Sequence, residues 1–138
     1  MKNYRFAYGK GSVTVSLDEQ SVLAVLHGNE APAMQDIRAG LMESLENPIG
    51  ATPLHEEIPA GARVALVVSD MSRFWMRQDL VIPHLVEYLH TACGVSYDKL
   101  TIVVANGTHP GGDEQELRTL VTSGVFDRVR VENHDCEA

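Results

Sequence analysis

The sequence is short of basic residues and of long apolar runs, and each shortage excludes a class of protein. It has 11 lysines and arginines against 19 acidic residues, a net charge of -8 with histidine neutral. Nucleic acids and anionic membranes both bind through a basic footprint, so we expect neither as a partner. No stretch approaches the roughly 18 consecutive apolar residues of a membrane-spanning helix.

Cysteine is also scarce, and this indicates where the protein resides. Only Cys93 and Cys136 are present, which is too few for a disulfide scaffold, and their separation is unlike that of metal-binding pairs. No apolar run follows the N-terminal residues, so the sequence predicts no secretory signal. We therefore expect reduced thiols and a cytoplasmic protein.

What is present is the composition of an ordinary globular domain. The 138 residues are 44% hydrophobic and 22% charged. A chain of this length buries roughly two thirds of the surface that its unfolded form exposes, so it can form a hydrophobic core without metals or disulfides. No repeat or low-complexity segment interrupts it, and we expect a single α/β domain over residues 1–138.

The first part of the chain is predicted to be rich in β-structure. Apolar and polar residues alternate over 4–8 and 12–17, and the glycine-containing segment 9–11 predicts a turn between two antiparallel strands. The apolar run 22–26 predicts a third strand.

A helix is expected to follow, beginning near Pro32. It should end at Asn47, because Pro48 disfavours helical geometry in the residue before it. A short helical turn is expected around 54–57.

From residue 61 onward the pattern alternates between strands and helices. The run 63–68 is nearly continuous in apolar and β-branched residues, which is typical of a strand covered on both faces. The elements expected after it are, in order, a helix over about 79–93 that Asp79 caps and Gly94 closes, a strand over 99–105, a helix with a capping box at Asp113 and Glu116, and a strand over 128–132. This order predicts an α/β fold with a Rossmann-like parallel βαβαβ sheet flanked by helices, and with a β-rich N-terminal sub-sheet.

Polar residues gather directly after each of the three expected parallel strands. The segments concerned are 69–73, 106–109 and 133–135. The carboxyl ends of parallel strands meet at one edge of a sheet, where open α/β sheets bind their ligands. We therefore expect the candidate site at that edge.

The first of these segments contains Asp70, Ser72 and Arg73. An arginine there can bind a carboxylate or phosphate with its planar fork, while Asp70 fixes its orientation or bonds a hydroxyl. The alternative is an exposed ion pair between Asp70 and Arg73, which would contribute at most about 1 kcal/mol. Ser72 can cap the following helix or offer its hydroxyl to a ligand oxyanion.

His109 is the main candidate in the second segment. Histidine suits proton transfer near neutral pH, and the glycines at 107, 111 and 112 let the backbone approach a ligand closely. His134 and Asp135, at the end of the third strand, are secondary candidates.

Four segments together resemble the nickel-pincer lactate racemase family. Residues 69–73, Ser-Asp-Met-Ser-Arg, are similar to the family's Asp-x-Thr-Arg-Pro segment, and 102–109 resembles its Ala-x-Gly-x-His-Arg segment. Residues 131–135 match the strand and the Asn-His-Asp that follow, and 47–54 match an upstream Pro-Ile-Gly and Pro-Leu. The likeness covers nearly the whole chain, in order.

The resemblance implies that the chain is the N-terminal part of a longer, two-domain enzyme that racemises or epimerises a 2-hydroxy acid. The implied reaction is hydride transfer with a nickel pincer nucleotide, through a planar 2-keto acid. The lysine that attaches this cofactor and the histidine that ligates nickel would lie in the C-terminal domain, so no metal ligand is expected within this chain. The fragment alone is expected to be inactive. The implied partners are the small 2-hydroxy acid, the C-terminal domain and, in a homo-oligomer, further copies of the protein.

The resemblance also assigns roles to individual residues. His109 would be one of two acid–base histidines, Arg73 would bind the substrate carboxylate or polarise its oxygen, and Asp70 would orient Arg73 and the ribose region of the cofactor. The residues implied on the cofactor side are Asp70, Ser72, Asn106, Gly107 and Thr108.

Three positions depart from the family's pattern. Ser72 stands where the family has threonine, Phe74 replaces the proline after the arginine, and Pro110 replaces the arginine after the histidine. The last change removes a positive charge beside the site. The substrate therefore stays open between lactate and another hydroxy acid.

Two other function classes fit the same residues. A non-catalytic nucleotide- or anion-binding module needs only the backbone amides at the helix N-termini after Ser72 and Gly112. A hydrolase or metal site could use Ser72, His109, His134 and Asp135. The chain has no Gly-x-Ser-x-Gly nucleophile elbow and no two histidines four residues apart, which disfavours this second class.

Overall fold

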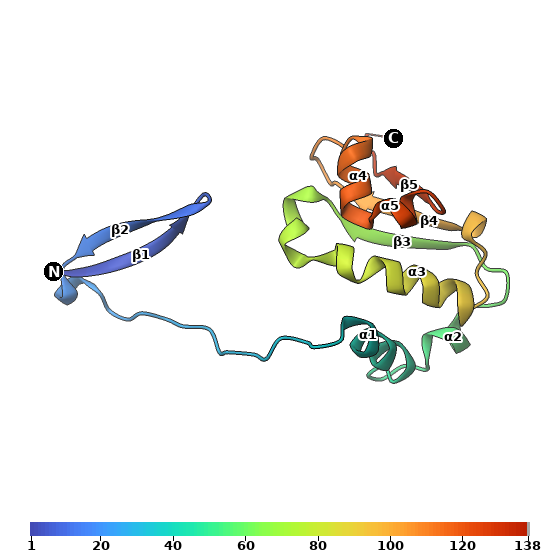
Figure 1. The fold of residues 1–138 in the computed structure, drawn as a ribbon, viewed down its shortest axis with the longest axis horizontal. Coiled ribbons are helices and arrows are strands. Elements are labelled where there is room, and N and C mark those ends of the chain that lie inside the picture. Colours follow the sequence, from blue (N-terminus) through green and yellow to red (C-terminus); the bar gives the residue numbers. More distant parts are fainter. Residues whose placement is uncertain (138) are drawn as a thin grey trace. The chain divides into compact units, whose positions relative to one another are not determined.

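The computed structural model describes residues 1–137 and divides the chain into two compact units, Met1–Ala33 and Met34–Ala138 (Figure 1). The expectation of a single domain over residues 1–138 stays a prediction. Within the described residues, no helix is long and apolar enough to cross a membrane.

The first unit is the predicted antiparallel hairpin, formed by β1 (Lys2–Tyr8) and β2 (Gly11–Leu17). Cross-strand pairing places Tyr4 opposite Val15 and Phe6 opposite Val13, so one face of the hairpin is apolar. The other face is polar and includes a hydrogen bond of 2.6 Å from Ser16 Oγ to Asn3 Oδ1. The alternation of residue types in the sequence therefore predicted both strands.

The third strand expected over 22–26 is wrong. The chain leaves β2 through a short 3-10 turn, η1 (Glu19–Ser21), which the Asp18 side chain caps, and continues to residue 35 without helix or strand. Leu23 and Leu26 are fully or almost fully exposed. An apolar run forms a strand only where another strand offers backbone partners, and within residues 1–137 none pairs with this segment.

The predicted start of the next helix is also wrong. Helix α1 (Ile37–Glu46) begins after Asp36, whose side chain accepts a hydrogen bond of 2.8 Å from Ala39 N. A carboxylate cap satisfies a free amide at the helix start, and Pro32 offers no such bond. The last helical residue is Glu46 and Asn47 caps the helix before Pro48, as predicted. The short helix α2 (Leu54–Glu57) is confirmed.

The second unit contains the predicted parallel sheet. Its strands β3 (Val64–Ser69), β4 (Leu100–Ala105) and β5 (Arg130–Asn133) lie in that order. Helix α3 (Ile82–Thr91) connects the first pair, while α4 (Glu114–Val121) and α5 (Ser123–Phe126) connect the second (Figure 1). Short 3-10 segments, η2 (Met71–Met76), η3 (Gln78–Leu80) and η4 (Tyr97–Lys99), complete the connections. The predicted α/β class with a Rossmann-like sheet and a separate β-rich start is confirmed.

Two of the three helix-end signals that we predicted are confirmed, and one is wrong. Asp113 and Glu116 form the predicted capping box of α4. Gly94 has a positive φ of 68° just after α3, as a closing glycine requires. Asp79 does not cap α3, because both of its carboxylate oxygens accept hydrogen bonds of 3.0 Å from Arg77, and the helix begins only at Ile82.

The core lies on one face of the sheet. Leu100, Ile102 and Val104 of β4 are completely buried, in one cluster with the inward residues of α3, α4 and α5. On the opposite face, Val67 is 64% exposed, so the expectation that this strand is covered on both faces is wrong for the described chain. Both connections carry their helices to the buried face, because residues of α3, α4 and α5 pack in the same cluster against β4.

Candidate functional site

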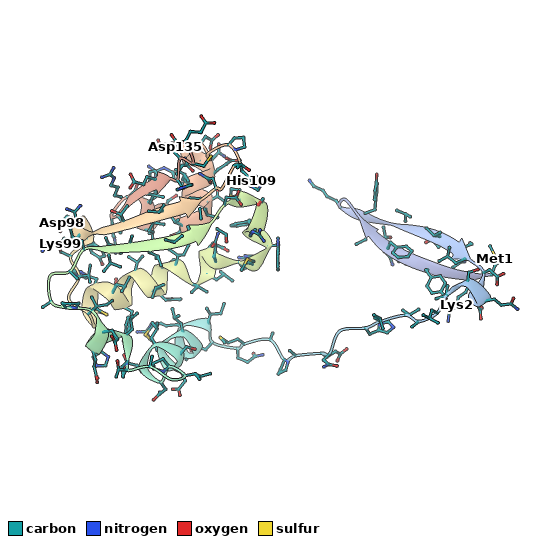
Figure 2. The ribbon with its side chains drawn as sticks, turned by 180° about the vertical axis from the view of Figure 1, so that it is seen from behind. Met1, Lys2, Asp98, Lys99, His109 and Asp135 are labelled. Atoms are coloured by element: carbon teal, nitrogen blue, oxygen red, sulfur yellow. The ribbon has the colours of Figure 1, made fainter. Side chains whose placement is uncertain are left out.

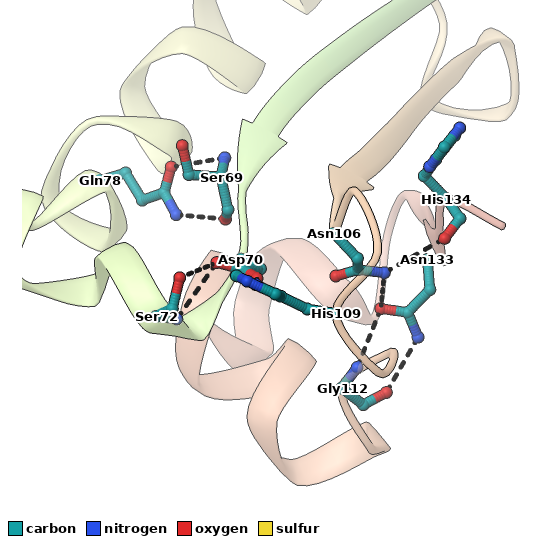
Figure 3. A network of polar contacts seen from close by, with 9 residues as sticks. All are labelled: Ser69, Asp70, Ser72, Gln78, Asn106, His109, Gly112, Asn133 and His134. Carbon is teal, nitrogen blue, oxygen red and sulfur yellow. Dashed lines mark hydrogen bonds and ion pairs between the residues drawn. The ribbon is translucent and has the colours of Figure 1, made fainter. Parts of the chain in front are cut away.

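The carboxyl ends of β3 and β4 bring Asp70 and His109 into contact. Ser69 pairs with Ala105 at the end of the two strands, so both chains leave the sheet at the same edge. Asp70 Oδ2 and His109 Nδ1 lie 2.5 Å apart (Figure 3). In Figure 2, His109 and Asp135 lie at this end of the sheet and Asp98 and Lys99 at the opposite end.

The Asp70 side chain is held on both of its oxygens. Oδ1 accepts hydrogen bonds from the Ser72 hydroxyl at 2.5 Å and from Ser72 N at 3.2 Å, as a cap for the first turn of η2. Oδ2 is left to face His109. Asp70 therefore caps η2, and the expectation that Ser72 would be the cap is wrong. The Ser72 hydroxyl instead fixes the rotamer in which Asp70 meets the imidazole.

Asp70 is the negatively charged member of this pair. The Ser72 hydroxyl and, next, the His109 ring stabilise the carboxylate, and they hold the pKa of Asp70 below its ordinary value of 3.8. The Asp70 side chain is 13% exposed, whereas that of His109 is 59% exposed. A carboxylate only accepts hydrogen bonds, so Nδ1 carries the hydrogen and Nε2 of a neutral ring is free to take a proton.

A cavity of about 440 Å³ lies beside this pair. Asp70, Ser72, Asn106 and His109 contribute its polar groups together with Glu116 of α4. Its apolar wall consists of Met71, Val104, Leu117 and Leu120, and the loop after β4 closes it with Pro110, Gly111 and Gly112. The cavity is therefore a partly apolar pocket at the strand ends with a few convergent polar groups, as ligand sites are.

Asn106 is the one buried polar residue of the described chain, with 3% exposure. Its Nδ2 donates to Asn133 Oδ1 at 3.1 Å and to the His134 carbonyl at 3.3 Å. Its Oδ1 has no partner within residues 1–137. A buried carbonyl oxygen without a donor is rare in folded proteins and needs an explanation.

Asn133 lies in the third polar segment that we predicted at this edge, where only His134 and Asp135 had been singled out as candidates. Its Oδ1 accepts from Gly112 N at 3.1 Å and its Nδ2 donates to Gly112 O at 2.9 Å (Figure 3). With the bond from Asn106, this amide ties the start of the His109 loop to its end. Its signals in the sequence are its place directly after a predicted strand and its match to the family's Asn-His-Asp.

Gln78 forms a similar clamp on the last residue of β3. Its amide donates to Ser69 O at 2.6 Å and accepts from Ser69 N at 3.2 Å. A side chain thus replaces a strand partner at the edge of β3, directly before Asp70. No pattern in the sequence marked Gln78 as part of the site.

The structure does not bring all predicted residues to the cavity. Arg73 lies outside the cavity lining, and its guanidinium has no hydrogen-bond or ion-pair partner in the described chain. Asp70 orients His109, and its side chain makes no bond with Arg73, whose backbone N bonds the Asp70 carbonyl at 3.1 Å. Gly107, with φ of 59°, and Thr108 belong to the exposed turn before His109.

His134 and Asp135 are also remote from the pair. The His134 ring points away from Asp70 and His109 (Figure 3), while its backbone N pairs with Val104 O at 2.9 Å. Asp135 is exposed and accepts from Glu137 N.

The contacts of Ser72 and α4 bear on the two other function classes. The Ser72 hydroxyl donates to Asp70 and has no bond with a histidine, so nothing activates it as a nucleophile. At the start of α4, Glu116 N is taken by Asp113, and the carboxylates of Asp113, Glu114 and Glu116 oppose an anion. Among the described residues, no cluster of three histidine, cysteine or acidic side chains could hold a metal.

Comparisons with known proteins identify the relatives of this chain. The structure of the lactate racemase apoprotein from Thermoanaerobacterium thermosaccharolyticum matches it with a TM-score of 0.77 and 20% identity, over 97% of this chain and 30% of that one. At this identity the likeness shows a common fold, and the chain spans less than a third of the length of that protein. No curated protein sequence matches it. The lactate racemase N-terminal domain family matches residues 8–138, and the chain belongs to that family.

Proposed function

We propose that the chain is the N-terminal domain of an isomerase that racemises or epimerises a 2-hydroxy acid by hydride transfer. Membership of the lactate racemase N-terminal domain family supports the reaction type. The contact between Asp70 and His109 is the observation that carries the proposal, because it supplies an oriented base at the edge of the sheet. The proposed partners are the substrate, a C-terminal domain and further copies in a homo-oligomer, and the proposed location is the cytoplasm.

In this proposal His109 moves the proton of the substrate's hydroxyl group. Asp70 accepts the hydrogen on Nδ1, which leaves Nε2 to take the proton from the oxygen on C2. The carboxylate then stabilises the imidazolium that forms, as the carboxylate of a catalytic triad does. The same nitrogen returns the proton when the 2-keto acid is reduced.

Arg73 is proposed to bind the carboxylate of the substrate. Its guanidinium has no partner in the described chain, so binding an acid would break no existing ion pair. Arginine binds a carboxylate through two parallel N–H donors, which fixes the plane of the acid as well as its position. Pro110, which lines the cavity, stands where the family has another arginine, and the proposed substrate class therefore stays at 2-hydroxy acids in general.

The cavity fits the hydroxyl-bearing part of the nickel pincer nucleotide that the resemblance implies. The orphaned Oδ1 of Asn106 and the carboxylate of Asp70 are acceptors that ribose hydroxyls can meet. Ser72, Gly107 and Thr108 would lie around the rest of the nucleotide, whose attachment lysine and nickel-ligating histidine are proposed to lie in the C-terminal domain. When bound, this group supplies the site that accepts and returns the hydride.

The test is an assay of the full product of the open reading frame, loaded with cofactor. Chiral chromatography follows the interconversion of the two enantiomers of lactate and of other 2-hydroxy acids. We expect His109→Gln to lower the turnover by at least about 100-fold, the usual contribution of a general base. The matched control is His27→Gln, because His27 is exposed in the segment that follows β2 and should leave turnover unchanged. An unchanged turnover of H109Q contradicts the proposal.

A second readout separates hydride transfer from proton abstraction at C2. Substrate deuterated at C2 keeps its label through hydride transfer, because the hydrogen moves to the cofactor and back. Abstraction as a proton would exchange the label with solvent. Mass spectrometry that finds the label lost in the racemised product therefore argues against the proposed reaction.

A further inference from the structure

We propose that Asn106 Oδ1 is a fixed hydrogen-bond acceptor for a hydroxyl group of the ligand, and that Asn133 keeps it in that orientation. The inference rests on the proposed function only in taking the cavity beside Asp70 and His109 as the ligand site. It predicts which chemical group the cavity selects, and it names a residue outside the cavity that determines this selection.

The first step is the orientation of the Asn133 amide. The backbone of Gly112 donates to Oδ1 and accepts from Nδ2, at 3.1 and 2.9 Å. Exchanging the oxygen and nitrogen would place two donors together and two acceptors together. The peptide backbone of Gly112 therefore determines that Asn133 presents its oxygen to Asn106.

The second step is the orientation of the Asn106 amide. Its neighbours on one side are Asn133 Oδ1 and the His134 carbonyl, which are both acceptors, so Nδ2 must face them. Oδ1 is then directed to the other side. In Figure 3 this oxygen points toward Asp70 and His109, and the nitrogen points toward Asn133.

Asn106 Oδ1 requires a partner that donates a hydrogen bond. Asn106 is 3% exposed and lines the cavity, yet its Oδ1 has no donor within residues 1–137. A buried acceptor without a hydrogen bond is unfavourable, so a ligand that brings a donor gains more than one that does not. A ligand with another acceptor at this point would be repelled.

The fourth step is the class of that donor. The other charged groups on the cavity wall, Asp70 and Glu116, are carboxylates, so an anionic oxygen is disfavoured beside them. A hydroxyl group donates to Asn106 without carrying charge. Two sources offer one in this setting, namely the ribose of a nucleoside and the hydroxyl of a hydroxy acid.

The experiment uses the 138-residue chain labelled with ¹⁵N. NMR follows the side-chain amide signals of Asn106 and the ring signals of His109 during four titrations. Nicotinamide riboside is compared with 1-methylnicotinamide, which keeps the positively charged ring and lacks the ribose. Lactate is compared with pyruvate, which lacks the hydroxyl. We expect the Asn106 signals to shift with a hydroxyl-bearing probe and not with its counterpart. A shift with the riboside assigns the hydroxyl to a ribose, and a shift with lactate assigns it to the acid.

Variants test the role of Asn133. We expect Asn106→Ala to weaken the binding of the hydroxyl-bearing probe by about tenfold, the value of one hydrogen bond. Asn133→Ala should weaken it to a similar extent although Asn133 does not line the cavity, because the Asn106 amide is then free to turn its NH₂ group inward. The control is Asn29→Ala, an exposed amide outside the second unit. Circular dichroism establishes that each variant is folded, and the comparison of probes on the unsubstituted chain does not depend on any variant.

The outcomes separate this inference from the proposed function. Equal shifts of the Asn106 signals with pyruvate and lactate, and with 1-methylnicotinamide and nicotinamide riboside, overturn the inference. So does a shift of the His109 signals alone, which leaves the proposed function in place. If no probe moves the Asn106 signals, the inference also falls, and the racemisation assay of H109Q still decides the proposed function.

Discussion

The Asp70 carboxylate and the His109 ring lie 2.5 Å apart although α3 and β4 separate the two residues along the chain. The contact depends on the parallel register of β3 and β4, whose last residues pair at the same edge of the sheet. It also depends on Ser72, which holds one oxygen of Asp70 so that the other faces the ring. A carboxylate fixed in this way determines which nitrogen of His109 carries the hydrogen.

Asp70→Asn should reverse the tautomer of His109. Ser72 N donates to the Oδ1 position, so the amide oxygen of the new side chain occupies it and the NH₂ group faces the imidazole. Nδ1 must then accept, and the hydrogen moves to Nε2. Long-range ¹H–¹⁵N NMR distinguishes the two tautomers, with Asp98→Asn at the opposite end of the sheet as the control (Figure 2). The same ring pattern in D70N and the unsubstituted chain would refute the assignment.

The lowered pKa of Asp70 predicts a stability that depends on acid pH. A carboxyl whose pKa is lower in the folded state stabilises the fold above its unfolded value, near 3.8, and this stability is lost as the pH falls through the folded value. The hydrogen bond from Ser72 is the largest cause. Ser72→Ala should therefore lower the urea midpoint at neutral pH, and the difference should shrink at about pH 2.

The control for this prediction is Ser44→Ala. Ser44 is an exposed serine on α1 whose hydroxyl bonds only the carbonyl of Gly40, so its effect should not depend on pH in this range. A difference between S72A and the unsubstituted chain that stays constant from neutral to acid pH would show that the Asp70 charge is not what Ser72 stabilises.

The parts of the fold that the sequence predicts are those with local causes. The apolar runs at β3 and β4 and the capping box at Asp113 each contain their own signal, and all three are confirmed. The run 22–26 has the same composition as a strand but no partner strand in the described chain, and pairing is not a local property. Helix α1 begins directly after its cap, Asp36, whereas the sequence pattern favoured a start at Pro32.

The sequence likewise predicts only part of the candidate site. Parallel topology predicts that Asp70 and His109 share an edge, because it places all strand ends together. It does not predict that Asp70 bonds His109 and leaves Arg73 free, since the choice is made by the rotamer that Ser72 fixes. The clamp of Asn133 on Gly112 joins a side chain to a backbone 21 residues away, and no spacing rule predicts such a contact.

Gly111→Ala should destabilise the protein by disturbing this clamp. A Cβ on Gly111 would lie 2.9 Å from Cγ and from Nδ2 of Asn133, which is closer than such atoms can approach. Asn133 must move, and we expect a loss of about 1–3 kcal/mol in the free energy of unfolding, the usual cost of overpacking. Urea unfolding measures this loss.

The matched control is Gly124→Ala, in α5. No atom lies within 4 Å of its added Cβ, and its φ is not positive. Alanine there should stabilise the chain by about 0.4–1 kcal/mol, because it restricts the unfolded state without a clash. A destabilisation of G111A no larger than that of G124A would mean that Asn133 adapts and that its position is not tightly set.

Tyr88→Phe should lower stability at neutral pH and reduce the loss of stability at alkaline pH. Tyr88 is buried on α3 and donates to Glu46 Oε1 at 2.6 Å, which ties α1 to α3. Burial first, and then the Glu46 carboxylate, raise the pKa of Tyr88 to about 12.

The neutral Tyr88 hydroxyl therefore contributes its full stability below the ordinary pKa of 10.0, and this contribution is lost as the pH rises through the raised pKa. We expect Y88F to lose about 1 kcal/mol at neutral pH, the worth of one hydrogen bond. Its alkaline decline should be smaller, because the Tyr88 hydroxyl is gone while the buried Cys93 thiol, whose pKa is also raised, remains. Unfolding in urea across this range measures both effects. Tyr8→Phe, at a 76% exposed position of the hairpin, is the control expected to change neither, and a Y88F protein that follows the alkaline decline of the unsubstituted chain would assign that decline to another group.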